Sequence, residues 1–206
     1  MFRTKYVIIF QKRVFIVYNI EEYRTIIREK LSDYRFYHSL CVCESAMVLA
    51  ERFGADVHKA EVAGILHDVM KESSPQEQLD VIAKANMHIT DFEKSQLKFY
   101  HQISGSAYAK AILGIDDEEI LNAIRYHTTG RDNMSLLEQV IYLADFISAD
   151  RDYQDVDIMR QQVEKGRRAG MLYATEFTIK SVVDKENMLH PDTVAAYNWL
   201  IKNENI

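Results

Sequence analysis

His67 and Asp68 stand side by side directly after the apolar run 63–66. An ionised carboxylate at the edge of an apolar core is costly unless it is bonded, and a bound metal ion is the usual compensation. The chain carries further histidines and one further aspartate in similar surroundings. Together, four imidazoles and two carboxylates on separate predicted helical segments are a suitable ligand inventory for a divalent or trivalent metal ion. The additional residues are His38, His101, His127 and Asp145.

The adjacency of His67 and Asp68 is informative because neighbouring side chains on a helix diverge by about 100°. From the end of a helix, both can still reach one ion lying alongside. Asp145 lies within the apolar stretch 141–147, where the alternative is a carboxylate that faces solvent or pairs with an arginine. His38, taken alone, would more often be a packed core residue, and the same holds for the later histidines. The metal-site hypothesis therefore depends on their joint occurrence in this order.

Cationic and hydroxyl residues lie close in sequence to the proposed ligands. Lys71 follows the pair by three residues, Thr128 directly follows His127, and Arg151 comes six residues after Asp145. Each of these side chains is most often a solvated surface residue when it occurs alone. Clustered around a metal ion, they are suited to hold a phosphate.

Length and composition indicate one soluble globular domain that is built mainly from helices. The chain has 206 residues, of which 48% are hydrophobic and 27% charged, and it contains only 2 Pro and 7 Gly. This composition excludes wholesale disorder and disfavours a turn-rich β architecture. The formal charge of −6, without a dense basic block, argues against nucleic acid as a partner. A phosphorylated small molecule remains compatible if a metal ion and local cations bind it.

The remaining histidines and the two cysteines indicate no second metal-binding motif. His58 and His88 occur in polar surroundings and are predicted to be surface residues. Cys41 and Cys43 are two residues apart in a helical pattern, so they point in different directions and are poorly placed to bridge each other. Reduced thiols in the cytoplasm are the simpler interpretation.

The N-terminal twenty residues differ from the rest of the chain. Two apolar runs, 7–10 and 14–18, are separated by a polar and basic interruption, and neither approaches the ~20 residues of a membrane span. The basic start resembles a signal peptide, but the apolar part is interrupted and no small-residue cleavage site follows. We therefore predict that residues 1–20 form a short β-like appendage or an extended start, and that residues 21–206 form the main domain.

Apolar periodicity and capping signatures predict an all-α domain from Glu21 onward. Ser-Pro-x-Glu at 74–77 and Ser-x-x-Glu at 135–138 are helix starts with a capping box. The predicted helices are 21–31, 33–53, 57–70, 74–86, 91–100, 101–113, 117–127, 135–147, 156–168, 172–184 and 191–203.

The ordered set His38, His67-Asp68 and Asp145 resembles the HD-domain metal-dependent phosphohydrolases, which are all-helical. The match is nearer to the YqeK-like HD proteins, the symmetrical bis(5'-nucleosyl)-tetraphosphatases, and extends from about residue 21 to the C-terminus. The segments 63–71, 124–130, 142–145 and 190–193 carry it. The stretch 147–149 departs from the family pattern, which more typically has an acidic residue and a proline before the arginine.

The resemblance implies hydrolysis of diadenosine tetraphosphate into two ADP, with iron (Fe2+ or Fe3+) as the metal and Mn2+, Co2+ or Mg2+ as substitutes. It implies that the metal ligands are His38, His67, Asp68 and Asp145, of which His38 and Asp145 also face the substrate. It places the phosphates against Lys71, His101, His127, Thr128 and Arg151, with Asp68, Lys71, His101 and His127 as the catalytic group. It places the nucleoside near Met188, Leu189, His190, Pro191, Asp192 and Thr193.

Other functions remain compatible with the same residues. An HD-type nucleotidase or a guanosine-polyphosphate hydrolase would keep the metal and change the substrate. A nucleotide-binding or iron-binding sensor would keep the site without turnover. The roles of His101 and His127 also stay open between hydrogen-bond donor, acid or base, and ligand of a second ion. The partner is expected to be a small nucleotide, with no nucleic acid or membrane involved, and a homodimer formed through the apolar N-terminal segment is an open alternative.

Overall fold

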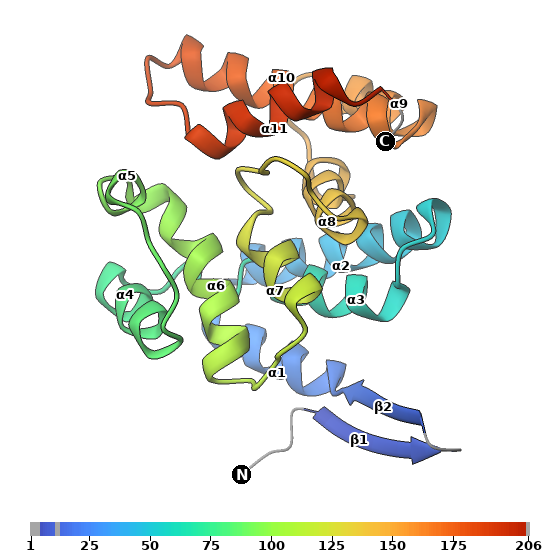
Figure 1. Ribbon diagram of the computed structural model, residues 1–206, viewed down its shortest axis with the longest axis vertical. Helices are drawn as coiled ribbons and strands as arrows, with labels where there is room; N and C mark the ends of the chain where they lie inside the picture. Colours follow the sequence, from blue (N-terminus) through green and yellow to red (C-terminus); the bar gives the residue numbers. More distant parts are fainter. Residues whose placement is uncertain (1–4, 11–12, 205–206) are drawn as a thin grey trace.

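The computed structural model describes residues 5–10 and 13–204, which form one β-hairpin followed by a succession of helices (Figure 1). The strands are β1 (Lys5–Phe10) and β2 (Arg13–Tyr18), and the helices are α1 (Ile20–Lys30), α2 (Asp33–Phe53), α3 (Val57–Leu66), α4 (Pro75–Lys84), α5 (Asp91–Lys94), the 3-10 helix η1 (Leu97–Phe99), α6 (Tyr100–Ala111), α7 (Glu118–Arg125), α8 (Leu136–Ile147), α9 (Val156–Lys165), α10 (Arg167–Asp184) and α11 (Pro191–Lys202).

The predicted all-α domain is confirmed, and the segment before it is a hairpin. β1 and β2 pair antiparallel, with Lys5 opposite Tyr18 and Phe10 opposite Arg13. Figure 1 shows this hairpin projecting beside α1 at one end of the molecule. Residues 1–4 and 11–12 of the predicted appendage lie outside the described residues, and the division into segments 1–20 and 21–206 stays a prediction. Over the described part of the chain, no helix is long and apolar enough to cross a membrane.

Local capping signals set most helix boundaries. Ser74 and Glu77 form the predicted capping box at the start of α4, and Ser135 and Glu138 form the one at the start of α8. Each pair satisfies two backbone N–H groups that a helix start leaves without partners. At the other end of α2, Gly54 adopts a left-handed conformation with φ of 82°, which ends the helix at little steric cost.

Several predicted helix boundaries were wrong. The helices predicted over 156–168 and 172–184 are α9 and α10, which meet at Gly166. The helix predicted over 57–70 ends at Leu66, and a series of tight turns carries His67 and Asp68. Backbone bonds there join residues three apart, as from Lys71 N to Asp68 O at 2.8 Å. The His67 ring also donates to the Gly64 carbonyl, which a continuing α-helix offers to the backbone N–H of Asp68. The helix predicted over 91–100 is instead split into α5 and η1.

Close packing of α3 on α2 brings the His-Asp pair toward the first histidine. α2 packs against both α3 and α8, and α3 and α8 also contact each other, so the elements that carry proposed metal ligands meet in one place. A Cβ atom at Gly64 would lie 2.9 Å from the Cα atom of Cys43 and 3.3 Å from the Cβ atom of Ala46. Since the nearest of these atoms is backbone, the glycine is required for the observed approach of the two helices.

We expect Gly64→Ala to lower the free energy of unfolding by about 1–3 kcal/mol, because the added methyl group must push α3 away from α2. Urea unfolding monitored by circular dichroism measures this change. His58→Ala, on the exposed face of the same helix, serves as the control and should change stability by less than about 0.5 kcal/mol. Equal stability of Gly64→Ala and the wild type would contradict the packing argument.

Candidate metal centre and active site

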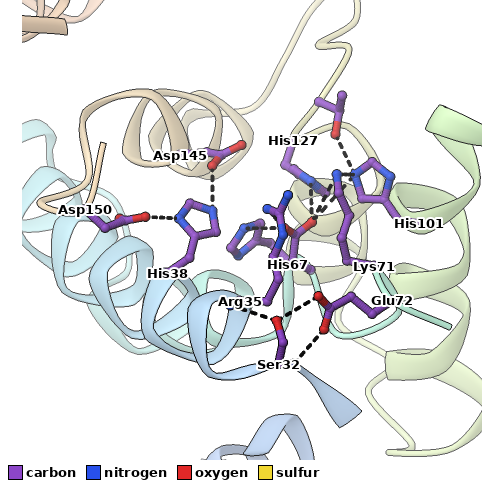
Figure 2. Close-up of polar contacts among 12 residues, drawn as sticks. Ser32, Arg35, His38, His67, Lys71, Glu72, His101, His127, Asp145 and Asp150 are labelled. Atoms are coloured by element: carbon purple, nitrogen blue, oxygen red, sulfur yellow. Dashed lines mark hydrogen bonds and ion pairs between the residues drawn. The ribbon is translucent and has the colours of Figure 1, made fainter. Parts of the chain in front are cut away.

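The predicted ligand residues come together from three helices, α2, α6 and α8, and from the turns after α3 and α7 (Figure 2). His38 of α2 lies with its Nε2 atom 3.1 Å from Asp145 Oδ1 of α8. The ring centroids of His38 and His67 are 5.3 Å apart. His38, His67 and Asp145 each offer one ligand atom, and these atoms lie within 4.8 Å of one another. The same is true of a second set, His67, Asp68 and His127, so His67 belongs to both.

The orientation of His67 leaves one nitrogen directed into this centre. Its Nδ1 atom donates to the Gly64 carbonyl at 2.7 Å, so the lone pair of a neutral ring is on Nε2. The ring is fully buried, and burial lowers the pKa of His67 to about 4. Among the described residues, His67 Nε2 and Asp68 Oδ1 are buried atoms without a hydrogen-bond partner. Two unsatisfied acceptors side by side in the interior fit a metal ion, which would coordinate both.

Asp68 lies between the metal-binding end of the site and its cationic end. Its Oδ2 atom is 3.1 Å from Arg35 Nη1, and its Oδ1 atom is 3.5 Å from His127 Nε2 and 3.6 Å from His101 Nε2. Burial acts to raise the pKa of Asp68, but the imidazoles and the charge of Lys71 outweigh it and hold that pKa well below its usual range. The carboxylate is therefore ionised at neutral pH.

His127 is oriented in the same way as His67. Its Nδ1 atom donates to the carbonyl of Ile124, three residues earlier, at 2.7 Å, and its Nε2 atom faces Asp68. The ring centroids of His67 and His127 are 5.0 Å apart, and those of His127 and His101 are 5.2 Å apart. The four histidines therefore form a continuous row from His38 to His101, which Figure 2 shows.

The end of the row at His101 carries hydrogen-bond donors suited to phosphate. Lys71 Nζ donates to His101 Nε2 at 2.9 Å, and Thr128 Oγ1 lies 3.0 Å from the same nitrogen. Burial and the charge of Lys71 hold the pKa of His101 well below its usual value, so the ring is neutral. Burial also lowers the pKa of Lys71, and the charge of Asp68 opposes that effect.

The opposite end of the row is built around His38. Its Nδ1 atom is bonded to Asp150 Oδ2 at 2.8 Å, and Ser148 Oγ donates to the other carboxylate oxygen of Asp150 at 2.7 Å. Arg151 donates to the carboxylate of Asp145, and its Nε atom donates to the Asp145 carbonyl at 2.7 Å. Burial acts to lower the pKa of His38, but the carboxylates of Asp145 and Asp150 raise it overall.

His190 is a buried residue at the start of α11, and its predicted contact with a nucleoside stays a prediction. Its Nδ1 atom accepts the backbone N–H of Asp192 at 3.1 Å, which makes it the N-cap of the helix. His190, Asp192 and Glu93 form a third potential metal-binding group. However, Glu93 is paired with Arg125, and the accepting Nδ1 atom leaves the proton of a neutral ring on Nε2. We therefore assign this group to the packing of α11.

The rest of the segment 188–193 is tied to the loop that carries Thr128. Thr193 Oγ1 donates to the Thr129 carbonyl at 2.9 Å. Met188 and Pro191 are exposed, and Leu189 is partly buried. A contact of this segment with a nucleoside stays a prediction.

Two residues of the centre were missed by the sequence analysis. Arg35 contacts Asp68, and its position three residues before His38 places both on one face of α2, which was the available signal. Asp150 orients His38 from the turn after α8. Helical periodicity could not predict this role, because Asp150 lies outside the helices and so belongs to no helix face.

Comparisons with known proteins identify relatives of this chain. The profile of the HD domain matches residues 35–150. A symmetrical bis(5'-nucleosyl)-tetraphosphatase of Bacillus subtilis is 37% identical over 185 residues, which cover 89% of this chain and 98% of that protein. A symmetrical bis(5'-nucleosyl)-tetraphosphatase of Staphylococcus aureus is 33% identical over 189 residues, which cover 88% of this chain and 94% of that protein. A crystal structure described as a predicted HD superfamily hydrolase involved in NAD metabolism from Clostridium acetobutylicum superposes with a TM-score of 0.85 at 35% identity, covering 90% of this chain and 98% of that one.

The chain therefore belongs to the HD-domain family of metal-dependent phosphohydrolases. Over most of its length it is similar to the symmetrical bis(5'-nucleosyl)-tetraphosphatases of that family.

The buried neutral state of His67 predicts a pH-dependent stability in metal-free protein. Its folded pKa of about 4 lies below the ordinary value of 6.5, so the unfolded chain binds more protons and stability falls as the pH is lowered from 6.5 toward 4. Between pH 7 and pH 5, we expect the free energy of unfolding to fall by about 2 kcal/mol less in His67→Gln than in the wild type. Urea unfolding of chelator-treated protein at both pH values measures it. His58→Gln, at an exposed position, should leave the pH dependence unchanged.

Proposed function

We propose that this protein hydrolyses diadenosine tetraphosphate symmetrically into two molecules of ADP. The observation that carries the proposal is the pair of buried, unsatisfied acceptors on His67 and Asp68, with the Lys71 Nζ atom 3.8 Å from Asp68 Oδ1. A metal-binding position next to phosphate-binding donors suits cleavage of a phosphoanhydride. The symmetrical tetraphosphatases that resemble this chain support the choice of substrate.

The ligands that we assign to the metal are His38, His67, Asp68 and Asp145. When bound, the ion would supply Lewis acidity toward a phosphoryl oxygen and a water of lowered pKa. Two imidazoles and two carboxylates suit iron, which is our first choice, with Mn2+ or Co2+ as substitutes. Mg2+ prefers an all-oxygen environment, so we expect it to be the weakest of the substitutes.

The remaining polar residues position the substrate and offset its charge. Lys71, at the His101 end of the row, and Arg151, at the His38 end, would donate to non-bridging phosphate oxygens as negative charge develops there. Arg151 now donates to Asp145, so it must redirect part of its guanidinium when a phosphate arrives. His127 is held by its backbone bond with Nε2 toward Asp68, where it can bind a phosphate, transfer a proton or hold a second ion.

The proposed cellular setting is the cytoplasm, with a small nucleotide as the partner. The free, buried cysteines Cys41 and Cys43 support a reducing compartment. An HD-type nucleotidase or guanosine-polyphosphate hydrolase, and a non-catalytic sensor, are the alternative functions. An assay of freshly purified protein against dinucleoside polyphosphates and mononucleotides, combined with elemental analysis, separates them. ADP as the sole product of diadenosine tetraphosphate supports the proposal, and nucleotide binding without turnover contradicts it.

Asp68→Ala is expected to abolish metal binding and hydrolysis together, because Asp68 supplies a proposed ligand and separates Arg35 from the imidazole row. Elemental analysis and quantification of ADP measure the two properties in the same preparation. Asp80→Ala, at an exposed position on α4, is the control and should retain both. Turnover by an Asp68→Ala variant that holds no metal would refute the assignment.

Lys71→Ala is expected to lower kcat/KM by about 10- to 100-fold while the metal content stays unchanged, because a charge-assisted hydrogen bond to phosphate is lost. Steady-state kinetics and elemental analysis test both parts. Lys84→Ala, an exposed lysine near the end of α4, should behave like the wild type. Loss of metal from the Lys71→Ala protein would show that the lysine supports the ligands instead of the substrate.

A further inference from the structure

A second cavity lies beside the turn that follows the metal-site helix α8. It has a volume of about 530 Å³ and is formed by α10 and residues 153–155. Tyr153, Tyr173 and Phe177 give it an aromatic wall. The side chains of Glu176 and Gln154 add hydrogen-bond acceptors at its edge. The rest of the lining is polar or charged, and an aromatic wall beside hydrogen-bonding groups can bind a nucleobase.

Few residues of the chain separate this cavity from the metal centre. Tyr153 donates its hydroxyl to the carbonyl of Phe146, the residue after Asp145, at 3.0 Å. The Tyr153 ring lies 5.2 Å from that of Phe177, and the Phe146 ring lies 6.2 Å from it, measured between centroids. The aromatic wall therefore begins two residues after Arg151 and packs against the neighbour of a proposed metal ligand.

The chain between the centre and the cavity has a fixed path. The guanidinium of Arg160 in α9 donates to three backbone carbonyls at the end of α8 and in the turn after it. These belong to Ile147 at 3.3 Å, Ser148 at 3.1 Å and Arg151 at 3.1 Å. One guanidinium thus satisfies backbone acceptors that the end of α8 leaves without partners. The geometry that relates Arg151 to Tyr153 is preorganised, which lowers the entropic cost of binding a ligand across both.

The row of imidazoles has two ends, one at His38 and one at His101, and a nucleoside contact has so far been predicted only near the His101 end. Figure 2 shows the row of rings running from His38, with Asp145 and Asp150, to His101. The segment 188–193 is tied to the loop beside the His101 end. In a dinucleoside tetraphosphate that is cut at its middle, one identical half lies on each side of the central P–O–P bridge that breaks. The second half must therefore leave the centre past His38 and Arg151.

We infer that the cavity between Tyr153, Tyr173 and Phe177 binds the second nucleoside of the substrate, and this inference rests on the proposed function. The aromatic faces would stack on a purine base. The carboxylate of Glu176 would accept a hydrogen bond from an exocyclic amino group, which adenine has. Arg151 would hold the phosphate chain where it passes from the centre to the cavity. The protein would then recognise both halves of the substrate through different side chains.

Equilibrium dialysis of ADP against the metal-loaded protein tests the inference directly, because both products of a symmetrical cleavage are ADP. We expect two ADP molecules per chain in the wild type. Tyr173→Ala should weaken one of them about tenfold, since a base loses its aromatic partner. Tyr197→Ala, a partly buried tyrosine of α11 that does not line this cavity, is the matched control and should bind two.

The outcomes separate the inference from the proposed function. A single ADP site in a wild-type protein that still produces two ADP overturns the second subsite and leaves the hydrolase intact. Absence of both ADP binding and hydrolysis overturns the proposed function, and the subsite with it. If Tyr173→Ala does not fold, Glu176→Ala at an exposed position replaces it, and unchanged affinity of both ADP sites in that variant overturns the base contact.

Kinetics with a truncated substrate provide a second test. Adenosine 5'-tetraphosphate has the same phosphate chain and lacks the second nucleoside. Tyr173→Ala is expected to lower kcat/KM for diadenosine tetraphosphate about tenfold and to leave the value for adenosine 5'-tetraphosphate unchanged. Equal losses on both substrates would indicate a structural effect on the centre and would overturn the inference.

Discussion

The site depends on two adjacent acceptors, His67 Nε2 and Asp68 Oδ1, that are buried without a hydrogen-bond partner in the described part of the chain. An arrangement of this kind is destabilising unless a ligand occupies it, so the surrounding structure must hold it in place. The close approach of α3 to α2 at Gly64 and the tight turns after Leu66 provide that support. The packing of the helices therefore stabilises the arrangement of His67 and Asp68 that an ion would need.

Backbone carbonyls, not other side chains, orient the central imidazoles. His67 and His127 each donate Nδ1–H to a carbonyl three residues earlier, so both direct Nε2 toward Asp68. Fixing the tautomer in this way keeps a lone pair available to an ion or a proton. The outer rings have different partners, since His38 is bonded to Asp150 and His101 to Lys71. The row therefore has an acidic end and a cationic end.

Charge in the centre is balanced before any ligand binds. The carboxylates Asp68, Asp145 and Asp150 face the cations Arg35, Lys71 and Arg151. Addition of a divalent cation would make the centre positive, although the whole chain carries a formal charge of −6. A local positive potential in an acidic protein favours a polyanionic small molecule over a nucleic acid, whose binding needs an extended basic surface.

The sequence by itself determined the helical fold and the identity of the six clustered residues, because periodicity, capping boxes and residue type are local properties. It did not determine that α3 ends before His67, since a side-chain bond to a carbonyl competes there with the regular helix. Only the tertiary structure joined Asp150 to His38 across 112 positions and formed an aromatic cavity from Tyr153 and α10. Such contacts depend on how α2, α8 and α10 pack, and packing between distant segments leaves no periodic trace in the chain.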